Sequence, residues 1–493
     1  MHWINFLHIY QPFNQSKQIM EKVTNECYRP LFKGLLEIPG IKINLNINAI
    51  LTERLVKEGY EDVVENIRKL AKDGKLEFTE TAKYHPLLPF LKEEDAIRQI
   101  KKNNRDNKKY FGEAYSPACF FPPEMAYSPS VAKVVSKLGY KMILIDEISY
   151  KAGKEAPPHN KLLTIEGTDG LIAVFRERRV SNSILSGGVR DTEEFRQIIK
   201  EDLKEDKYLC TAMDGETFGH HHPGLEKFLF KVLGGQEPEQ VFFSELTDYY
   251  EVEETASPIK STWASSIEDI EEGIQFYSWK NPNNKVHQIQ WKFLDYLLRL
   301  SNNKEVTPEI EEEIDKSLAS DQFYWASGEP WWSLEMIEKG AWMALEALRS
   351  FPTLSEEELE KGEQYYKEIL STAFQWQRSG KIDQLAKKYK ETVRIPFKER
   401  TLEKGDPETY YAFLNVLKDK MKEAAEKENF EKAIMLRNGI WKIEKKNDIY
   451  DAMHVIDLLR IDVPGAELQE LLQRYKEEYK RIQPGQPELR RSR

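Results

Sequence analysis

Residues 1–275 alternate short runs of apolar, β-branched and aromatic residues with stretches that carry apolar residues at helical spacing. Strands that alternate with helices form βαβ units around a parallel sheet, so this pattern restricts the fold more than any other feature. The expected strands are Trp3–Leu7, Lys42–Ile47, Leu76–Phe78, Ala118–Phe121, Met142–Ile145, Ile172–Phe175 and Tyr208–Ala212, and the expected helices include Leu51–Leu70, Pro129–Leu138 and Thr192–Lys204. The fold class is therefore α/β. Ligands of such folds bind at the carboxyl ends of the strands.

Polar residues with catalytic potential gather where these strands end. His8 follows the first strand, Glu77 and Glu80 lie on the third, and Glu124 and Asp214 follow two later ones. The carboxyl ends of parallel strands meet at one edge, so a repeated placement of this kind indicates a shared site.

The pattern becomes helical from about residue 285 onward. The expected helices are Val286–Leu300, Pro308–Leu318, Leu334–Leu348 and Ser355–Tyr389, and Asp406–Lys427 with Asn429–Lys446 reads as an αα-hairpin. We therefore expect an α/β domain over residues 1–275, an α-helical domain over 276–400, and a helical hairpin with its tail over 401–493. The tail, residues 483–493, is expected to be disordered.

Composition narrows the classes of protein that fit. Lys and Arg number 72 against 83 Asp and Glu, and the net charge of −11 argues against a nucleic acid partner. No apolar run approaches the ~20 residues that span a bilayer, so no membrane association is expected. The first residues lack a signal-peptide pattern, and Cys27, Cys119 and Cys210 are too few for a disulfide framework, which together favour the cytoplasm.

Two of the acids are candidates for proton transfer and nucleophilic attack. Glu124 follows a strand within FFPPEMAYSP, where prolines stiffen the loop, and Asp214 follows another within TAMDGETFG, where Gly215 permits a sharp turn. Glycosidic bond cleavage needs such a pair, one group to protonate the leaving oxygen and one to attack carbon or activate water. The alternative is that each acid caps a helix, and Ser128 begins a helix shortly after Glu124.

The run His220-His221-His222 raises the question of a metal site. Consecutive side chains on a strand diverge, so the three cannot all face one ion. Zinc would need further ligands, such as His8, His85 or Asp214. We interpret His220 and His222 as hydrogen-bonding or sugar-contacting residues and expect no metal and no cofactor, while a metal-dependent polysaccharide deacetylase stays the rival enzyme.

Five segments occur in the order of the conserved regions of glycoside hydrolase family 57, whose members act on α-glucans and related sugars. The sequence resembles that family through LHIYQP (7–12), GKLEFTETAKYHPLLP (74–89), CFFPPEMAYSPSVA (119–132), MDGETFGHHHPGLE (213–226) and LASDQFYWAS (318–327). The resemblance covers roughly residues 1–350.

The resemblance implies an incomplete seven-stranded (β/α) barrel over residues 1–275, completed by the helical domain. It further implies a retaining glycoside hydrolase or 4-α-glucanotransferase, with Glu124 as nucleophile and Asp214 as acid/base. We expect their carboxyl groups about 5–5.5 Å apart and expect Asp214 to have a raised pKa.

The remaining site residues are assigned to sugar binding by position in the matched segments. They are His8, Gln11, Glu77, His85, Glu216, His220, Asp321, Tyr324 and Trp325. An aspartate such as Asp321 can hold hydroxyl groups while Trp325 stacks on a ring, although SDQFYW also fits a helix N-cap followed by core aromatics. The family's second histidine in the first segment is Tyr10 here, which leaves substrate preference open.

The C-terminal hairpin resembles the helical-hairpin motif of nucleotide-excision-repair proteins, in which it mediates protein contacts. A protein partner is therefore a candidate for this hairpin, and packing on the chain's own helices is the alternative. The whole chain could also be a non-catalytic carbohydrate-binding scaffold. Neither the oligomeric state nor the choice between hydrolysis, transfer and branching follows from the sequence.

Overall fold

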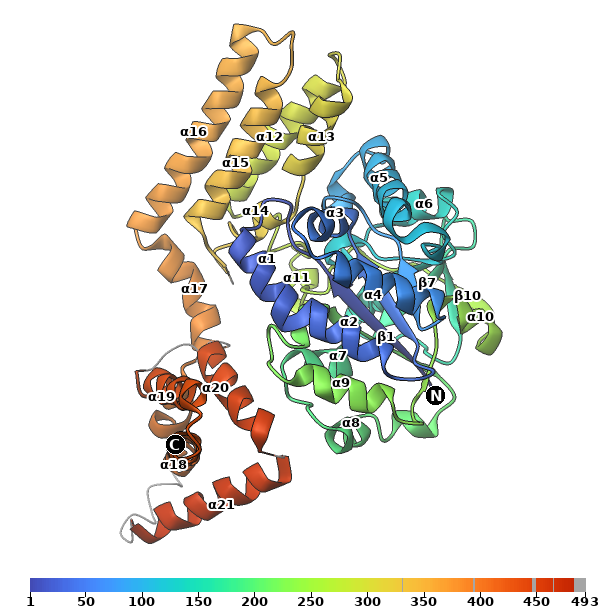
Figure 1. The fold of residues 1–493 in the computed structure, drawn as a ribbon. Helices are drawn as coiled ribbons and strands as arrows, with labels where there is room; N and C mark the ends of the chain where they lie inside the picture. Colours follow the sequence, from blue (N-terminus) through green and yellow to red (C-terminus); the bar gives the residue numbers. More distant parts are fainter. Residues whose placement is uncertain (330, 393–394, 446–448, 464, 483–493) are drawn as a thin grey trace. The chain divides into compact units, whose positions relative to one another are not determined.

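The structure, a computed structural model, describes residues 1–329, 331–392, 395–445, 449–463 and 465–482 (Figure 1). The tail expected to be disordered, residues 483–493, lies outside these ranges. The described chain forms two compact units: Met1–Thr217 with Phe228–Leu385, and Phe218–Lys227 with Ala386–Arg493. The expected division at residues 275 and 400 stays a prediction.

Parallel strands form the centre of the first unit. One sheet has the order β3–β2–β1–β8, with β9 also beside β1, and the other has the order β10–β6–β7–β5–β4. The strands are β1 His2–Ile9, β2 Ile43–Ile47, β3 Leu76–Thr79, β4 Cys119–Phe120, β5 Met142–Asp146, β6 Leu162–Ile165, β7 Ile172–Arg176, β8 Tyr208–Asp214, β9 Glu239–Gln240 and β10 Val252–Ala256. All seven strands expected from the sequence are present.

Hydrogen bonds between the two sheets close the strands into a barrel. The backbone N–H of Glu80 donates to Cys119 O at 2.9 Å, which joins β3 to β4, and that of Glu177 donates to Cys210 O at 2.8 Å, which joins β7 to β8. The ring therefore runs through β1, β2, β3, β4, β5, β7 and β8, seven strands in all. The strands of this ring that pair within a sheet are parallel to each other.

Amphipathic helices cover the strands. They are α1 Lys17–Val23, α2 Arg29–Leu36, α3 Ala49–Lys57, α4 Glu61–Lys72, α5 Glu93–Phe111, α6 Pro129–Lys137, α7 Arg178–Leu185, α8 Thr192–Ile198, α9 Leu225–Leu233, α10 Leu246–Tyr249 and α11 Ile267–Glu271. The single helix expected over residues 51–70 is two helices, because Gly59 adopts a φ of 86° between α3 and α4. α6 begins at Ser128, whose hydroxyl accepts from the Val131 N–H at 3.3 Å.

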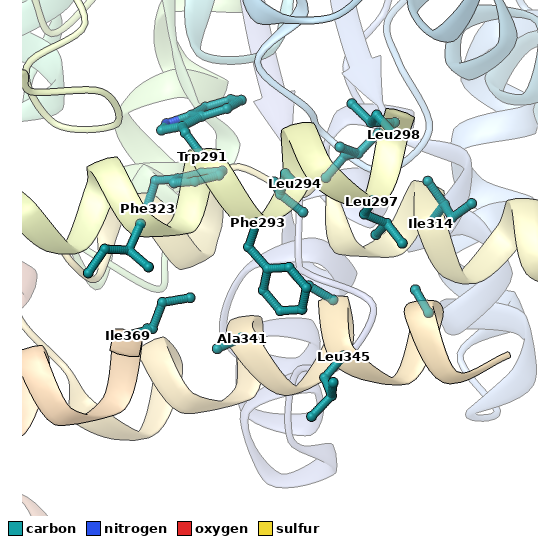
Figure 2. Close-up of a cluster of buried hydrophobic side chains, with 14 of the residues drawn as sticks. Trp291, Phe293, Leu294, Leu297, Leu298, Ile314, Phe323, Ala341, Leu345 and Ile369 are labelled. Atoms are coloured by element: carbon teal, nitrogen blue, oxygen red, sulfur yellow. The ribbon is translucent and has the colours of Figure 1, made fainter. Parts of the chain in front are cut away.

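Further helices follow the barrel; all belong to the first unit except the last, which continues past the end of that unit at Leu385. They are α12 Lys285–Ser301, α13 Pro308–Ser317, α14 Asp321–Tyr324, α15 Leu334–Arg349, α16 Glu356–Arg378 and α17 Lys381–Thr392. α12, α13, α15 and α16 lie side by side in Figure 1 and enclose one apolar core. Trp291 stacks on Phe323 with ring centroids 4.3 Å apart, and Figure 2 shows Phe293 above Ala341 and Leu345 of α15.

The second unit has its own core. Its helices are α18 Pro407–Glu426, α19 Phe430–Glu444, α20 Ile449–Asp462 and α21 Gly465–Ile482. The apolar side chains of Leu417, Leu436, Ile440 and Leu459 are buried together, so the expected αα-hairpin of α18 and α19 is present and packs on further helices. Within the described residues, the structure has no helix long and apolar enough to cross a membrane.

The buried cluster in Figure 2 allows the effect of single substitutions on stability to be predicted. Phe293 is 1% exposed, so Phe293→Ala should lower the free energy of unfolding by about 3–5 kcal/mol, because it removes buried apolar surface and leaves a cavity. Phe374 on α16 is 43% exposed, and Phe374→Ala should change stability by about 0.5 kcal/mol or less. Urea denaturation followed by circular dichroism measures both; equal losses in the two variants would contradict this description of the core.

Candidate active site

The barrel brings the predicted acids to one end. His8 near the end of β1 is the register partner of Asp214 at the end of β8, and Glu124 lies four residues beyond β4. Asp321 at the start of α14 joins them from the helical region, since its charge acts on Glu124 and its carboxylate contacts Tyr10. Residues from strands far apart in the sequence thus share one polar site.

Glu124 is held in a strained backbone conformation. Its φ is 60°, which costs a non-glycine residue energy and is found where the surrounding structure enforces it. Its Oε2 accepts from Nε1–H of Trp263 at 3.0 Å, and its Oε1 accepts from the Ser320 hydroxyl at 3.3 Å. Ser128 caps α6, so the alternative role of Glu124 as a helix cap is not what the structure shows.

The carboxyl group of Glu124 resists ionisation. Burial raises its pKa to about 8, and the negative charges of Asp214 and Asp321 act in the same direction. The donors Trp263 and Ser320 oppose this by stabilising the charged form. The side chain is 17% exposed, so it lies in the site wall with its edge accessible.

Asp214 is the partner acid. Burial raises its pKa to about 6, while the guanidinium of Arg176 acts in the opposite direction. Gly215 follows it and begins the tight 3-10 turn Gly215–Thr217. A Cβ at this position would lie 2.5 Å from Cγ2 of Ile9, so β1 leaves no room for a side chain. Two buried carboxyl groups that oppose each other's charge hold one proton between them more readily than none.

Glu216 is a third buried acid beside this pair. It is 4% exposed, and its Oε1 accepts from the Tyr28 hydroxyl and, at 3.2 Å, from the backbone N–H of Tyr10. Burial and the charge of Asp214 raise its pKa to about 8. Its hydrogen bonds fix its position next to Asp214.

Three aromatic rings form a stack across the site. The ring centroids of Tyr10 and His85 are 4.1 Å apart, and those of His85 and His8 are 5.2 Å apart. Burial lowers the pKa of His8 to about 4 and that of His85 well below its usual range, so both imidazoles are neutral near pH 7. Asn46 binds Nδ1 of His8 at 2.9 Å.

His85 connects this stack to Glu124. Its Nδ1 lies 3.0 Å from the hydroxyl of Ser320 and 3.7 Å from Oε1 of Glu124. Its buried Nε2 has no hydrogen-bond partner among the residues that the structure describes. A polar atom of this kind is available to a ligand.

Tyr10 occupies the position where the resemblance leads one to expect a histidine. Its hydroxyl donates to Oδ2 of Asp321 at 2.7 Å. Burial and the neighbouring Asp321 charge raise the pKa of Tyr10 well above its usual range, so the phenol stays protonated and keeps donating. The substitution therefore links the first matched segment to the last.

The predicted aromatic residues Tyr324 and Trp325 belong to an aromatic cluster after Asp321. Asp321–Tyr324 forms the short helix α14, and Trp325 directly follows it. Tyr324 stacks on Trp279 with centroids 5.7 Å apart and its hydroxyl accepts from Nε1–H of Trp331 at 2.7 Å. Trp325 lies 5.6 Å from the Trp331 ring. Trp279 is buried, whereas Tyr324, Trp325 and Trp331 are partly exposed, so these three rings can stack with a ligand.

Two predicted binding residues lie elsewhere or at the margin, Glu77 elsewhere and Gln11 at the margin. Glu77 is the second residue of β3, and its carboxylate accepts from the Ser244 N–H at 3.2 Å, toward the amino ends of the strands. Its placement does not support sugar contact, because a residue near the start of a strand lies at the opposite end from the carboxyl ends, where the acids gather. Gln11 accepts from the Gln15 side chain at 3.1 Å and lies beside Tyr28.

The histidine run belongs to the second unit, not to the first. His220 and His221 have ring centroids 5.5 Å apart, and His222 Nδ1 lies 2.6 Å from Oδ2 of Asp457 on α20. Among the residues that the structure describes, no group of three or more His, Cys, Asp or Glu side chains is arranged to hold a metal ion.

Sequence reasoning missed the side chains that support the two acids. They are Asp146, Arg176, Arg178, Trp263 and Ser320. Asp146 ends β5 and Arg176 ends β7, so the rule that identified Asp214 would also have found them. Trp263 follows no strand directly, and nothing in its local sequence indicates its contact with Glu124.

Comparison with known proteins gives two matches along the chain. The profile of glycosyl hydrolase family 57 matches residues 3–253, half of the chain, and that of the UvrB/uvrC motif matches residues 412–446. A putative alpha-amylase of Methanocaldococcus jannaschii is 26% identical over 284 residues, which are 52% of this chain and 57% of that protein. A 4-alpha-glucanotransferase of Thermococcus litoralis is 23% identical over 310 residues, or 57% of this chain and 46% of that protein. The chain thus spans about half the length of these relatives.

Solved structures show the same fold. The crystal structure of 4-alpha-glucanotransferase from Thermococcus litoralis has a TM-score of 0.59 at 17% identity and covers 71% of this chain and 60% of that one. A branching enzyme of family 57 type from Pyrococcus horikoshii has a TM-score of 0.56 at 16% identity and covers 74% and 94%. The expected (β/α) barrel followed by helices is confirmed.

Proposed function

This chain belongs to glycosyl hydrolase family 57, and on that premise we propose that it is a retaining glycoside hydrolase or 4-α-glucanotransferase that acts on α-linked glucans. The observation that carries the proposal is the pairing of Glu124 with Asp214, two largely buried carboxyl groups, one beyond the end of β4 and one at the end of β8, with the charge of Asp214 acting on Glu124. A retaining double displacement needs one carboxylate to attack and one acid to donate a proton.

Glu124 attacks the anomeric carbon and forms a glycosyl-enzyme intermediate. Asp214 protonates the departing glycosidic oxygen, and then takes the proton of the incoming water or sugar hydroxyl, which breaks the intermediate. With a pKa of about 8 for Glu124 and about 6 for Asp214, the shared proton resides mainly on Glu124. The reactive state, with the proton on Asp214 and the charge on Glu124, is therefore the less populated of the two one-proton forms. The Trp263 and Ser320 donors favour this distribution because each stabilises an ionised Glu124. The retaining mechanism predicts a carboxyl separation of about 5–5.5 Å.

The sugar that reacts is held by the polar and aromatic side chains around this pair. Asp321, oriented by the Tyr10 hydroxyl, accepts from sugar hydroxyls, and the unpartnered Nε2 of His85 offers a further contact. His8 and Glu216 lie in the same group, Gln11 lies at its margin, and Tyr324 and Trp325 supply faces for stacking. The assignment of His220 to substrate binding stays a prediction, and that of Glu77 is not part of this proposal.

The C-terminal hairpin supplies a surface for a protein partner. α19 buries Leu436, Ile440 and Ile443 and exposes Phe430, Ile434 and Trp441, so its outer side carries large apolar side chains next to the charged Arg437. None of Cys27, Cys119 and Cys210, all described, forms a disulfide. A cytoplasmic location stays a prediction.

Replacing the nucleophile tests the catalytic pair. Glu124→Gln keeps the shape and removes the charge, so kcat on maltooligosaccharides should fall at least about 1000-fold without loss of folded protein. Glu77→Gln is the matched control, because Glu77 contacts Ser244 and not the acids, and it should keep kcat. Retention of activity by Glu124→Gln would overturn the assignment.

The pH dependence follows from the shared proton. Below the first ionisation both carboxyl groups are neutral and Glu124 cannot attack; above the second both are charged and no donor remains. With a pKa of about 6 for Asp214 and about 8 for Glu124, a plot of kcat/KM against pH should be a bell whose limbs lie near these values. Rates constant from about pH 5 to about pH 9 would be incompatible with the shared proton.

Product analysis tests the substrate class. Maltohexaose should be converted to shorter chains by hydrolysis, or to both shorter and longer chains by transfer, with unchanged rates in EDTA. The products are separated by size, and new branch points are sought by debranching. Inert maltooligosaccharides, together with EDTA-sensitive release of acetate from an acetylated polysaccharide, would support the deacetylase instead.

A further inference from the structure

Trp263 contacts Glu124 through both its backbone and its side chain. Its backbone N–H donates to Glu124 O at 3.3 Å, and its indole N–H donates to Glu124 Oε2 at 3.0 Å. Ser261 and Tyr127 exchange backbone hydrogen bonds of 2.9 and 3.3 Å beside this contact. The loop that carries Trp263 is therefore paired with the strained turn that carries Glu124.

Arg178 holds this loop through hydrogen bonds to its backbone. Arg178 Nη2 donates to the carbonyl groups of Trp263 at 3.0 Å and of Ser265 at 2.8 Å. The Nε–H of Arg178 donates to Oδ1 of Asp146, which is fully buried at the end of β5. A guanidinium held by a buried carboxylate has few alternative positions, so it is a rigid support.

The same carboxylate also reaches the strand of Asp214. Oδ2 of Asp146 accepts from Nη1–H of Arg176 at 3.0 Å, and Nε–H of Arg176 donates to Ala212 O at 2.8 Å, two residues before Asp214. Asp146 thus connects the support of Glu124 to the strand of Asp214 through one arginine on each side.

We propose that Trp263 is a positioning residue for Glu124, and that Asp146 with Arg178 holds Trp263 in place. The proposal rests on the proposed function, in which Glu124 is the nucleophile. The indole N–H of Trp263 binds one oxygen of the Glu124 carboxylate and thereby holds the carboxylate in a single orientation toward the substrate. Orientation of this kind contributes to the rate because small displacements of a reacting atom are costly.

The indole donor also affects where the shared proton resides. Glu124 is faced by the carboxyl groups of Asp214 and Asp321, by the neutral imidazole of His85 and by the hydroxyl of Ser320. Of these, Ser320 is the second donor, at the longer distance of 3.3 Å. Without the Trp263 N–H the ionised form of Glu124 is less stable, which moves the proton toward Glu124.

Trp263→Phe tests the proposal because it keeps an aromatic ring and removes the donor. α-Maltosyl fluoride is the probe, since fluoride leaves without protonation and its release reports attack by Glu124 alone. We expect fluoride release to slow about 10- to 100-fold with little change in KM. In a plot of the rate of fluoride release against pH, the acid limb, which reports the ionisation of Glu124, should move to higher pH. A structural role alone would not move that limb.

Trp3→Phe is the matched control. Its indole N–H donates to the Thr211 hydroxyl at 2.9 Å, so the variant also loses one buried hydrogen bond of an indole, but not one to Glu124. It should lose thermal stability and keep both the rate of fluoride release and the position of the acid limb. Thermal denaturation of each variant shows how much folded protein is present.

Arg178→Met tests the support. It should slow fluoride release as Trp263→Phe does, and the double variant should be little slower than either single one, because both act through the same contact. Additive losses, or a Trp263→Phe variant with the native rate and pH profile, would overturn the proposal and leave the proposed function intact. Native activity in Glu124→Gln would overturn the proposed function itself.

Discussion

The burial of Glu124 and Asp214 at one end of a parallel barrel is the constraint on which the rest of the site depends. Water would leave both carboxyl groups ionised at neutral pH, and neither could then hold a proton for a leaving group. Burial raises both pKa values, and the charge of Asp214 raises that of Glu124 further. The neighbouring groups then decide which acid holds the remaining proton. Neutral imidazoles, one phenol and two donors to Glu124 surround the pair, while the Asp321 charge raises the pKa of Glu124 and the Arg176 charge lowers that of Asp214.

The fold follows from the sequence to a large degree because its signals are local. The buried strands of the barrel are short runs of apolar residues, and helices such as α4 carry Val63, Ile67 and Leu70 at helical spacing. The break between α3 and α4 was missed, although Gly59 marks it. Barrel closure was expected only from the family resemblance, because the contacts of Glu80 with Cys119 and of Glu177 with Cys210 join residues that no local pattern relates.

The site residues also fall into those that local sequence signals identify and those that depend on contacts between distant segments. Glu124 and Asp214 follow strands and could be found by position. Tyr10 could be noted as a departure, but its bond to Asp321 spans more than three hundred residues of sequence and required the fold. Glu77 lies on the expected strand, but at its second residue, and the sequence pattern did not distinguish the start of a strand from its carboxyl end. The histidine run looked like a ligand set, yet His222 contacts Asp457 within the second unit. The contacts of Trp263 with Glu124 and Arg178 join residues far apart in the sequence, so no local pattern could predict them.

The central claim is that Glu124 forms a covalent bond to the sugar. A fluorinated α-glycosyl fluoride that forms the intermediate quickly and releases it slowly should label the protein once, and mass spectrometry of the digested protein should locate the label. The account predicts one added glycosyl group on the peptide that contains Glu124, lost again when an acceptor sugar is supplied. A label on another residue, or turnover of the reagent with no covalent adduct at any time, would contradict it.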